Sequence, residues 1–270
     1  MGALADFVTH FRISPGGSPR DLLERVGTAF ACLPYENVSK IVRRAEAGTD
    51  AAARRSPEEV IRGYIDRGTG GTCFSLTSAL AFLVRGLGYR ADTILADRRY
   101  GPDTHCALMV WLDGIPHLMD PGFLIARPIP LECAKRREVA APGQRLVLES
   151  GENPGRVALS TVRKGSETRR LTYKIAAADR GAFLKAWDAS FGWDMMRVPL
   201  LTRRIGARQI YLNGTRFQAS EGDSVARQEW PAEKLVEAIA AEFRIDASLV
   251  ARAVAILKER GETLGKASNR

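Results

Sequence analysis

The segment Arg67–Phe74, with the sequence RGTGGTCF, decides how the chain is interpreted because it joins two predicted helices and carries a cysteine. Its glycines allow the backbone to turn tightly and to approach a ligand closely. Cys73 falls at the start of the second helix, where the helix dipole and free N–H groups favour thiolate over thiol. Cys73 is therefore a candidate nucleophile, and a buried structural cysteine is the alternative.

Helical signals surround this segment. Ser56–Glu59 form a capping box with proline in the first turn, and Gly68 suits the end of that helix. The next helix is predicted from Cys73 to Gly88, with Leu76, Leu80, Leu83, Val84 and Leu87 at helical spacing. An earlier helix is predicted to begin at Ser18-Pro19. Residues 1–88 are thus expected to be mostly helical.

The middle of the chain changes to short β-prone runs separated by turn residues, which predicts a small antiparallel barrel or sandwich. The predicted strands are Asp92–Ala96, His105–Leu112, Ile115–Met119, Arg145–Leu148, Arg156–Val162 and Arg169–Ile175.

The last third mixes both types of element. Asn213-Gly214 predicts a hairpin joining Gln209–Leu212 to Thr215–Gln218. Leu235, Ile239 and Phe243 share one face of a predicted helix, and Asp246 is expected to cap a last one. The tail Gly265–Arg270 is expected to fray.

A second candidate group comes from the hairpin signal Asp113-Gly114. A two-residue turn there places His105 and Asp120 on one face of the hairpin as diagonal neighbours, within side-chain reach. The same parity places Cys106 and His117 on the opposite face, where we expect ordinary packing or exposure. A carboxylate beside an imidazole fixes its tautomer, so a cysteine at the other ring nitrogen would complete a set of nucleophile, base and orienting group.

Composition limits the remaining options. The 270 residues include 40 basic and 31 acidic ones, which gives a formal charge of +9. Three explanations of this excess remain: a solvated surface, nucleic-acid binding, or binding of a phosphate-rich small ligand such as a coenzyme. No nucleic-acid recognition motif, long apolar run or signal peptide is found, so we expect a cytoplasmic protein without nucleic-acid or membrane partners. Cys32, Cys73, Cys106 and Cys133 lack C-x-x-C spacing, which argues for free thiols rather than a metal site or disulfides.

Several motifs together resemble the arylamine N-acetyltransferase family over nearly the whole chain. Arg67–Phe74 resembles its R-G-G-x-C-F motif, and Leu33–Asn37 its I-P-F-E-N segment. Thr104-His105, Leu112–Gly114 and Asp120–Phe123 resemble its T-H, L-D-G and D-V-G-F-G motifs in the same order. Val198–Thr202 resembles a segment near the start of the family's third domain.

The resemblance implies an α+β fold of three parts: a helical bundle at 1–88, an antiparallel β-barrel at 89–190 and an α/β lid at 191–270. It implies a papain-like triad of Cys73, His105 and Asp120. It also implies ping-pong acyl transfer to an aromatic amine or hydrazine, with acetyl-CoA or another acyl thioester as co-substrate and no bound cofactor. The positions implied for substrate or CoA binding are Tyr35, Phe74, Thr104, Gly122, Phe123 and Leu124.

Because the sequence departs from the family pattern at several positions, the resemblance does not identify the acceptor or the acyl donor. Ser75 and Thr77 stand where the family has larger polar residues, and Leu124 replaces the last glycine of D-V-G-F-G. We expect Leu124 to add a side chain beside the triad and to alter acceptor choice. An amide synthase, a cysteine hydrolase or transglutaminase-like enzyme, and an inactive binding protein of the same fold are the alternatives.

Overall fold

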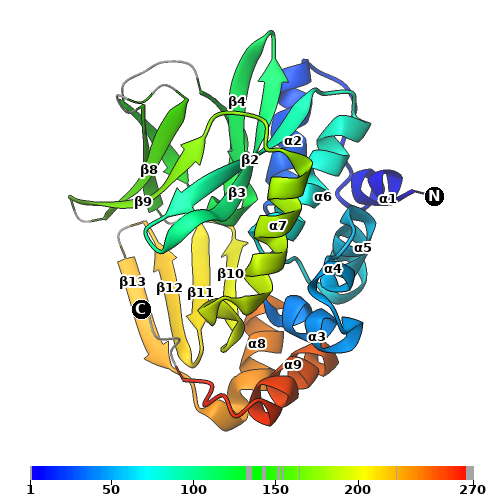
Figure 1. Ribbon diagram of the computed structural model, residues 1–270, viewed down its shortest axis with the longest axis vertical. Coiled ribbons are helices and arrows are strands. Elements are labelled where there is room, and N and C mark those ends of the chain that lie inside the picture. Colours follow the sequence, from blue (N-terminus) through cyan, green and yellow to red (C-terminus); the bar gives the residue numbers. More distant parts are fainter. Residues whose placement is uncertain are drawn as a thin grey trace.

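The computed structural model describes residues 2–131, 136–141, 144–150, 153, 155–163, 165–222 and 224–265. Within them, two antiparallel sheets are accompanied by helices: α1, α2, α5 and α6 gather along one side of the larger sheet, whereas α3 lies beside α9 (Figure 1). Cys133 and residues 266–270 of the predicted tail lie outside the described residues. No helix in the described ranges is long and apolar enough to cross a membrane.

The N-terminal helices begin and end largely where local signals place them. Ser18 and Ser56 each form the predicted capping box, with Asp21 and Glu59 respectively. The helices predicted from Ser56 and Cys73 are both present, whereas α1, α3 and α4 had not been predicted individually. The bounds are α1 Ala3–His10, α2 Pro19–Phe30, α3 Val38–Ala47, α4 Asp50–Ala53, α5 Pro57–Arg67 and α6 Cys73–Gly86.

The larger sheet has the strand order β5-β4-β3-β2-β9-β8-β7-β6, an open half-barrel with β5 and β6 at its edges. Its strands are β2 Ala91–Arg98, β3 Gly101–Leu112, β4 Ile115–Asp120, β5 Ile125–Pro130, β6 Arg136–Ala141, β7 Gln144–Ser150, β8 Arg156–Arg163 and β9 Ser166–Lys174. The two edge strands had not been predicted. Pro128 and Pro130 weaken the strand signal of β5, and an edge is where a sheet tolerates prolines.

The predicted register of the β3–β4 hairpin is confirmed. Leu112 pairs with Ile115 across the Asp113-Gly114 turn, and the register continues to the pair Leu108 and Met119. The two faces of β3 contribute to different cores: Cys106 and Leu108 pack on the helices, while Ala107 and Met109 face the interior of the half-barrel.

The smaller sheet has the order β1-β10-β11-β12-β13, with the two-residue β1 bringing the N-terminal part of the chain to its edge. Its strands are β1 Tyr35–Glu36, β10 Leu200–Ile205, β11 Arg208–Asn213, β12 Arg216–Glu221 and β13 Ser224–Glu229. The predicted hairpin exists, but its turn is displaced by one residue because Asn213 pairs with Arg216. Gly214, with φ of 62°, therefore opens the turn, since glycine takes this left-handed conformation without steric cost.

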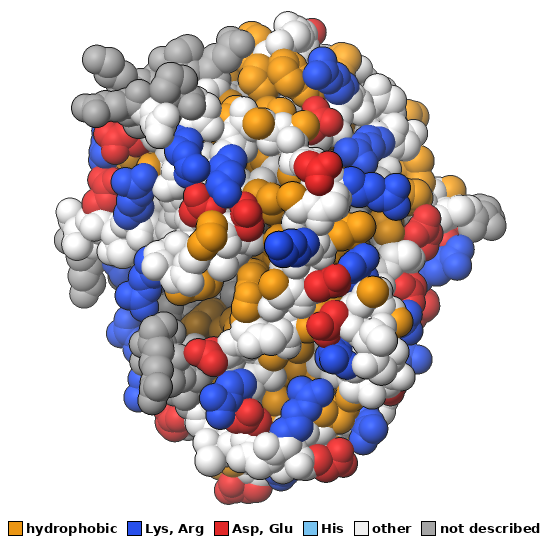
Figure 2. All heavy atoms as spheres, in the orientation of Figure 1, with side chains coloured by type: hydrophobic (Ala, Val, Ile, Leu, Met, Phe, Trp, Pro, Cys, Tyr) orange, Lys and Arg blue, Asp and Glu red, His pale blue; other side chains and the backbone are white. Residues whose placement is uncertain are grey.

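Three further helices complete the described fold: α7 Arg180–Ala189, α8 Leu235–Phe243 and α9 Ala247–Glu259. Asp246 caps α9 as predicted, accepting a hydrogen bond from Leu249 N. Leu235, Ile239 and Phe243 all pack in the core beneath the smaller sheet. Basic and acidic side chains are interspersed over the visible face of the molecule rather than gathered into one patch (Figure 2).

Candidate active site

The loop before α6 holds Cys73 through contacts with the segment around β1. The backbone N–H of Gly70 donates to the buried Glu36 carboxylate at 3.2 Å, and Arg55 donates to the Gly70 carbonyl at 2.8 Å. A Cβ at Gly70 would lie 1.9 Å from the Pro34 carbonyl oxygen, so only glycine fits there. Cys73 follows as the first residue of α6, and its side chain is buried.

His105 and Asp120 lie together on the inner face of the half-barrel, as the hairpin parity predicts. His105 Nε2 lies 2.7 Å from Asp120 Oδ2, and both side chains are fully buried. Asp120 also accepts a hydrogen bond of 2.6 Å from the Tyr173 hydroxyl, and the N–H groups of Gly122 and Phe123 donate to its other oxygen at 2.8 and 3.2 Å. Each carboxylate oxygen of Asp120 therefore has two hydrogen-bond partners.

The pKa values of this pair follow from the balance between burial and partners. Burial alone would raise the pKa of Asp120, but the His105 charge and the hydrogen bonds outweigh it, and the pKa is lowered. Burial alone would lower the pKa of His105, but the Asp120 carboxylate outweighs it, and the pKa is raised. The arrangement therefore favours an imidazolium beside a carboxylate.

The sulfur of Cys73 interacts with both His105 and Cys106. A hydrogen bond from Cys106 is the largest influence, and with the His105 hydrogen bond it overcomes the effect of burial, so the pKa of Cys73 lies well below its ordinary value. Burial raises the pKa of Cys106, which stays a thiol and can donate. Cys106 was expected only to pack or to be exposed; it packs in the core on the helix side of β3, and there it also meets Cys73.

Arg98 is a further polar group at this site. One guanidinium nitrogen lies 3.0 Å from His105 Nδ1, and another donates to the Tyr100 hydroxyl at 2.8 Å. The guanidinium carbon lies 5.5 Å from the centre of the Phe123 ring. Because guanidinium only donates, this contact is a hydrogen bond only while His105 is neutral with its proton on Nε2, toward Asp120. In the imidazolium form Nδ1 also carries a proton and donates to Cys73.

A cavity of about 660 Å³ is lined in part by Arg98 and Tyr100. Its wall combines aromatic side chains with three arginines, and Asp194 is the acidic residue among the described lining residues. The lining includes Tyr35, Arg98, Arg99, Arg170, Trp193 and Tyr211.

Of the residues predicted for substrate binding, Tyr35 lies in the wall of this cavity and the others lie elsewhere among the described residues. Tyr35 lines the cavity, and the Phe123 ring meets His105 edge-on with centroids 5.4 Å apart. Phe74 is fully buried against Phe183, Trp187 and Trp193. Thr104 bonds to Gly101 O at 2.8 Å, which shapes the β2–β3 turn.

Gly122 and Leu124 lie on either side of Phe123. A Cβ at Gly122 would approach His105 Cε1 to 2.7 Å, so the small residue is needed beside the imidazole. Leu124 has a left-handed backbone with φ of 58°, and its buried side chain lines a different cavity, of about 780 Å³, with Thr28 and Arg127. The structure therefore does not bring Leu124 to the cavity that Tyr35 lines.

Ser75 and Thr77, the departures on the first turn of α6, are both buried and both bonded. Ser75 donates to Thr72 O at 3.1 Å, and Thr77 donates to Cys106 O at 3.4 Å. Neither is among the residues described as lining the cavity. Their hydroxyls fasten the start of α6 to its own N-cap and to β3.

Sequence reasoning missed Arg98 and Tyr173. Ala96 pairs with His105 on one side and with Tyr173 on the other, so the three side chains lie in one row across β3, β2 and β9. Only the strand order could reveal this row. Arg98 had a weak local signal, because it lies two residues beyond Ala96 in a strand that leads into the His105 strand.

Comparisons with known proteins identify the family and the fold. A sequence profile described as N-acetyltransferase matches residues 22–251. The fold is similar to that of the arylamine N-acetyltransferase from Salmonella typhimurium, with a TM-score of 0.76 and 17% identity, covering 94% of this chain and 98% of that one. No curated protein sequence matches the chain.

Two structures from Mycobacterium marinum are also similar. Its arylamine N-acetyltransferase gives a TM-score of 0.79 at 16% identity, and the same enzyme in complex with CoA gives 0.79 at 15%. Each alignment covers 95% of this chain and 98% of the other. At these identities the structural likeness establishes the α+β fold.

Proposed function

Because the chain belongs to the arylamine N-acetyltransferase family, we propose that it moves an acetyl or other acyl group from a CoA-type thioester, through an acyl-Cys73 intermediate, to an amine. The observation that carries the proposal is the position of Cys73. It begins α6, has a lowered pKa, and meets an imidazole that is itself bonded to a buried carboxylate at 2.7 Å. This arrangement is that of a nucleophile, a base and an orienting group.

In the first half-reaction the Cys73 thiolate attacks the thioester carbonyl. Backbone N–H groups at the start of α6 stabilise the oxyanion, a contribution of about 3 kcal/mol per donor. The C–S bond of the donor then breaks, and His105 gives its proton to the departing thiolate. The products are a free thiol and the neutral thioester of Cys73.

In the second half-reaction an amine attacks the acyl group on Cys73. His105 takes the amine proton, the amide forms, and Cys73 leaves as thiolate to restore the imidazolium–thiolate pair. Asp120 holds the imidazole through Nε2 and stabilises its positive charge in both steps. Its bonds to Tyr173, Gly122 and Phe123 keep that carboxylate in place.

The three segments have separate roles in this proposal. Residues 1–88 supply the nucleophile, residues 89–190 supply His105 and Asp120, and residues 191–270 cover the cavity with β10 and β11. The binding of CoA by the M. marinum enzyme supports a CoA thioester as donor. The net charge of +9 also suits a phosphate-bearing thiol.

The test is an acetyl-CoA pulse followed by intact mass measurement and an amine chase. We expect an adduct of about 42 Da on Cys73 that is stable in buffer and is discharged by an arylamine or hydrazine. Cys73→Ala should take up no label, whereas Cys32→Ala, which alters an exposed thiol, should behave as the unaltered protein.

The alternative enzyme classes give different results in the same experiment. Fast loss of the adduct without amine would identify a hydrolase. If acetyl-Cys73 is not discharged by any amine, but an acyl thioester that carries its own amine is cyclised, the protein is an amide synthase. Absence of any adduct would leave a binding protein of the same fold.

A further inference from the structure

Two thiols meet at the start of α6, and the proposed acyl transfer uses only one of them. Cys106 on β3 is fully buried and packs in the same core cluster as Cys73. Thr77, one helical turn beyond Cys73, donates to the Cys106 carbonyl at 3.4 Å. This bond fastens β3 to the face of α6 that carries Cys73, because residues four apart share a helix face. No step of the proposed mechanism moves an atom of Cys106.

The two side chains are joined directly by a hydrogen bond from the Cys106 sulfur to the Cys73 sulfur. The pKa of Cys73 lies well below its ordinary value, whereas burial raises the pKa of Cys106. The pair therefore consists of a thiolate and the thiol that donates to it. A thiolate is the form of cysteine that peroxides oxidise, and a thiol in contact with the oxidised sulfur is the group that can close a disulfide.

Cys32 differs from this pair in its surroundings. It is exposed, and its sulfur contacts the Thr28 carbonyl at 3.9 Å. Partial burial of the sulfur raises the pKa of Cys32, so it stays a thiol at neutral pH and reacts slowly with peroxides despite its exposure. Cys32 therefore serves as the internal control for the chemistry of the pair.

We propose that Cys106 is a resolving thiol: when a hydroperoxide oxidises Cys73, Cys106 forms a disulfide with it and keeps the oxidation reversible. The site is a modification site separate from the proposed function, because no acyl group takes part. The oxidant is a hydroperoxide, and a small thiol restores the reduced pair.

The reaction has two steps. With hydrogen peroxide, the Cys73 thiolate attacks one oxygen, the O–O bond breaks, and His105 gives its proton to the departing hydroxide, which leaves a sulfenic acid and one water. The Cys106 sulfur then attacks the Cys73 sulfur, the S–O bond breaks, and the hydroxyl leaves with the Cys106 proton as a second water. The peroxide gains two electrons, and each sulfur loses one.

The contact between the sulfurs decides whether oxidation can be reversed. A sulfenic acid that meets a second peroxide becomes a sulfinic acid, which thiols do not reduce. Cys106 already touches the Cys73 sulfur, so its attack is intramolecular, whereas a second peroxide must first diffuse into a buried site. The disulfide therefore stops the nucleophile from reacting without destroying it.

The test treats the reduced full-length protein with hydrogen peroxide in the absence of any acyl donor. Intact mass measurement should show a loss of about 2 Da, and peptide mapping should find Cys73 joined to Cys106, both changes being reversed by dithiothreitol. The map is made on the unaltered chain, so it does not depend on the folding of any variant.

Variants at Cys106 test the protective role. In Cys106→Ser and Cys106→Ala, Cys73 should gain about 32 Da as sulfinic acid, and the fraction that dithiothreitol returns to thiol should fall about fivefold or more. Products are compared once the Cys73 thiol is fully consumed, so a slower reaction in a variant does not affect the comparison. Cys32→Ala is the matched control and should form the disulfide as the unaltered protein does.

Three results would each overturn the proposal: a disulfide from Cys73 to Cys32 or Cys133, persistence of both thiols, or as much sulfinic acid in the unaltered protein as in Cys106→Ser. The acetyl-CoA pulse described above tests the proposed function separately. A protein that forms the disulfide but takes up no acetyl group would contradict the function and leave the resolving role of Cys106 standing. Acetylation without disulfide formation would contradict only the resolving role.

Discussion

At the scale of single residues, burial and neighbouring groups shift the pKa values of His105 and Asp120 in opposite directions, and the neighbouring groups have the larger effect. Asp120 and His105 are both fully buried, yet each is shifted toward its charged form because the other is 2.7 Å away. The stability contributed by Asp120 is complete above its unfolded pKa and is lost as the pH falls through its lowered folded pKa. That contributed by His105 is complete below its unfolded pKa and is lost as the pH rises through its raised folded pKa.

Asp120→Asn should keep the fold and lose most of the acyl transfer. An amide cannot stabilise the imidazolium and favours the wrong tautomer, an effect on the order of 10⁴-fold in a triad with the same roles. Single-turnover acylation measures it. The control is His117→Ala, because His117 contacts Arg20 and the Ile115 carbonyl instead of the site. Equal damage from His117→Ala and His105→Ala would contradict the assignment of His105 as the base.

Tyr173→Phe should raise the pKa of Asp120, since it removes a hydroxyl that donates to the carboxylate at 2.6 Å. We expect unfolding at acid pH to begin at a higher pH, and stability at neutral pH to fall by about 1–2 kcal/mol. Acyl transfer should fall on the order of tenfold. Urea unfolding between pH 4 and pH 7 measures the shift, and Tyr211→Phe, whose hydroxyl lies away from Asp120, is the control. Parallel stability curves for Tyr173→Phe and the unaltered protein would show that the hydroxyl does not support the carboxylate.

At the scale of elements, the position of Cys73 depends on how β1 holds the loop before α6. Glu36 accepts from Gly70 N and from the Ser39 N–H and hydroxyl, while Asn37 bonds to Met195 O, Val198 O and Leu200 N. The short segment Tyr35–Asn37 thereby joins the α6 loop to the smaller sheet. A change in this segment should displace Cys73 without touching it.

Gly70→Ala tests this connection. The added Cβ would lie 1.9 Å from Pro34 O, so the loop must move, which we expect to cost about 2 kcal/mol and to impair acylation of Cys73. Thermal unfolding and the mass-based acylation assay give the two effects. Gly16→Ala is the matched control, because the nearest atom to its Cβ is Ser14 Oγ at 3.8 Å. Acylation as fast as in the unaltered protein would show that the loop does not position the nucleophile.

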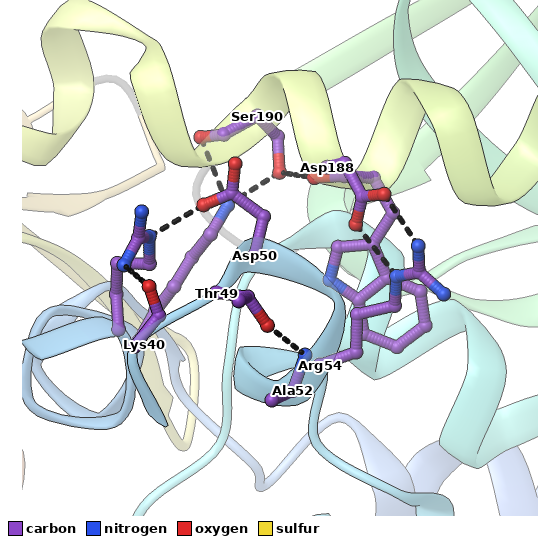
Figure 3. A network of polar contacts seen from close by, with 10 residues as sticks. Lys40, Thr49, Asp50, Ala52, Arg54, Asp188 and Ser190 are labelled. Carbon is purple, nitrogen blue, oxygen red and sulfur yellow. Dashed lines mark hydrogen bonds and ion pairs between the residues drawn. The ribbon is translucent and has the colours of Figure 1, made fainter. Parts of the chain in front are cut away.

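At the scale of the whole molecule, a buried cation lies where α3, α4 and the end of α7 meet (Figure 3). Lys40 Nζ donates to the Ser190 carbonyl at 3.0 Å and to its hydroxyl at 2.5 Å, and it lies 4.5 Å from the centre of the Phe191 ring. Arg54 pairs with Asp188 close by, so the same helices are also joined by an ion pair. No carboxylate among the described residues pairs with Lys40.

Lys40 should make the free energy of unfolding increase as the pH rises through the alkaline range. Burial lowers its pKa from 10.5 to about 8, so between these values the unfolded chain carries a proton that the folded protein lacks. Stability therefore increases with pH in this window, by up to about 3 kcal/mol for this group. Urea unfolding of the protein and of Lys40→Met at pH 7.5, 9 and 10.5 isolates the effect, since other groups cancel in the difference. Curves that stay parallel across the three pH values would contradict it.

What the sequence determined by itself was local. The capping boxes at Ser18 and Ser56 depend on residues three apart, and the β3–β4 register depends on one turn, so short-range geometry was sufficient. The same register brought His105 and Asp120 together, and the start of α6 placed Cys73 at a helix N-terminus. The division into three segments and the catalytic roles of these residues remain predictions.

Only the tertiary structure decided which groups surround that pair. Tyr173 reaches Asp120 because β9 pairs with β2, and Cys106 meets Cys73 because α6 packs on β3. Leu124, whose backbone is left-handed, lines another cavity. These contacts join elements far apart in the chain, and no periodic pattern in the sequence predicts which residues make them. Their positions follow from strand order and helix packing, which are set by burial of the whole apolar surface rather than by any short segment.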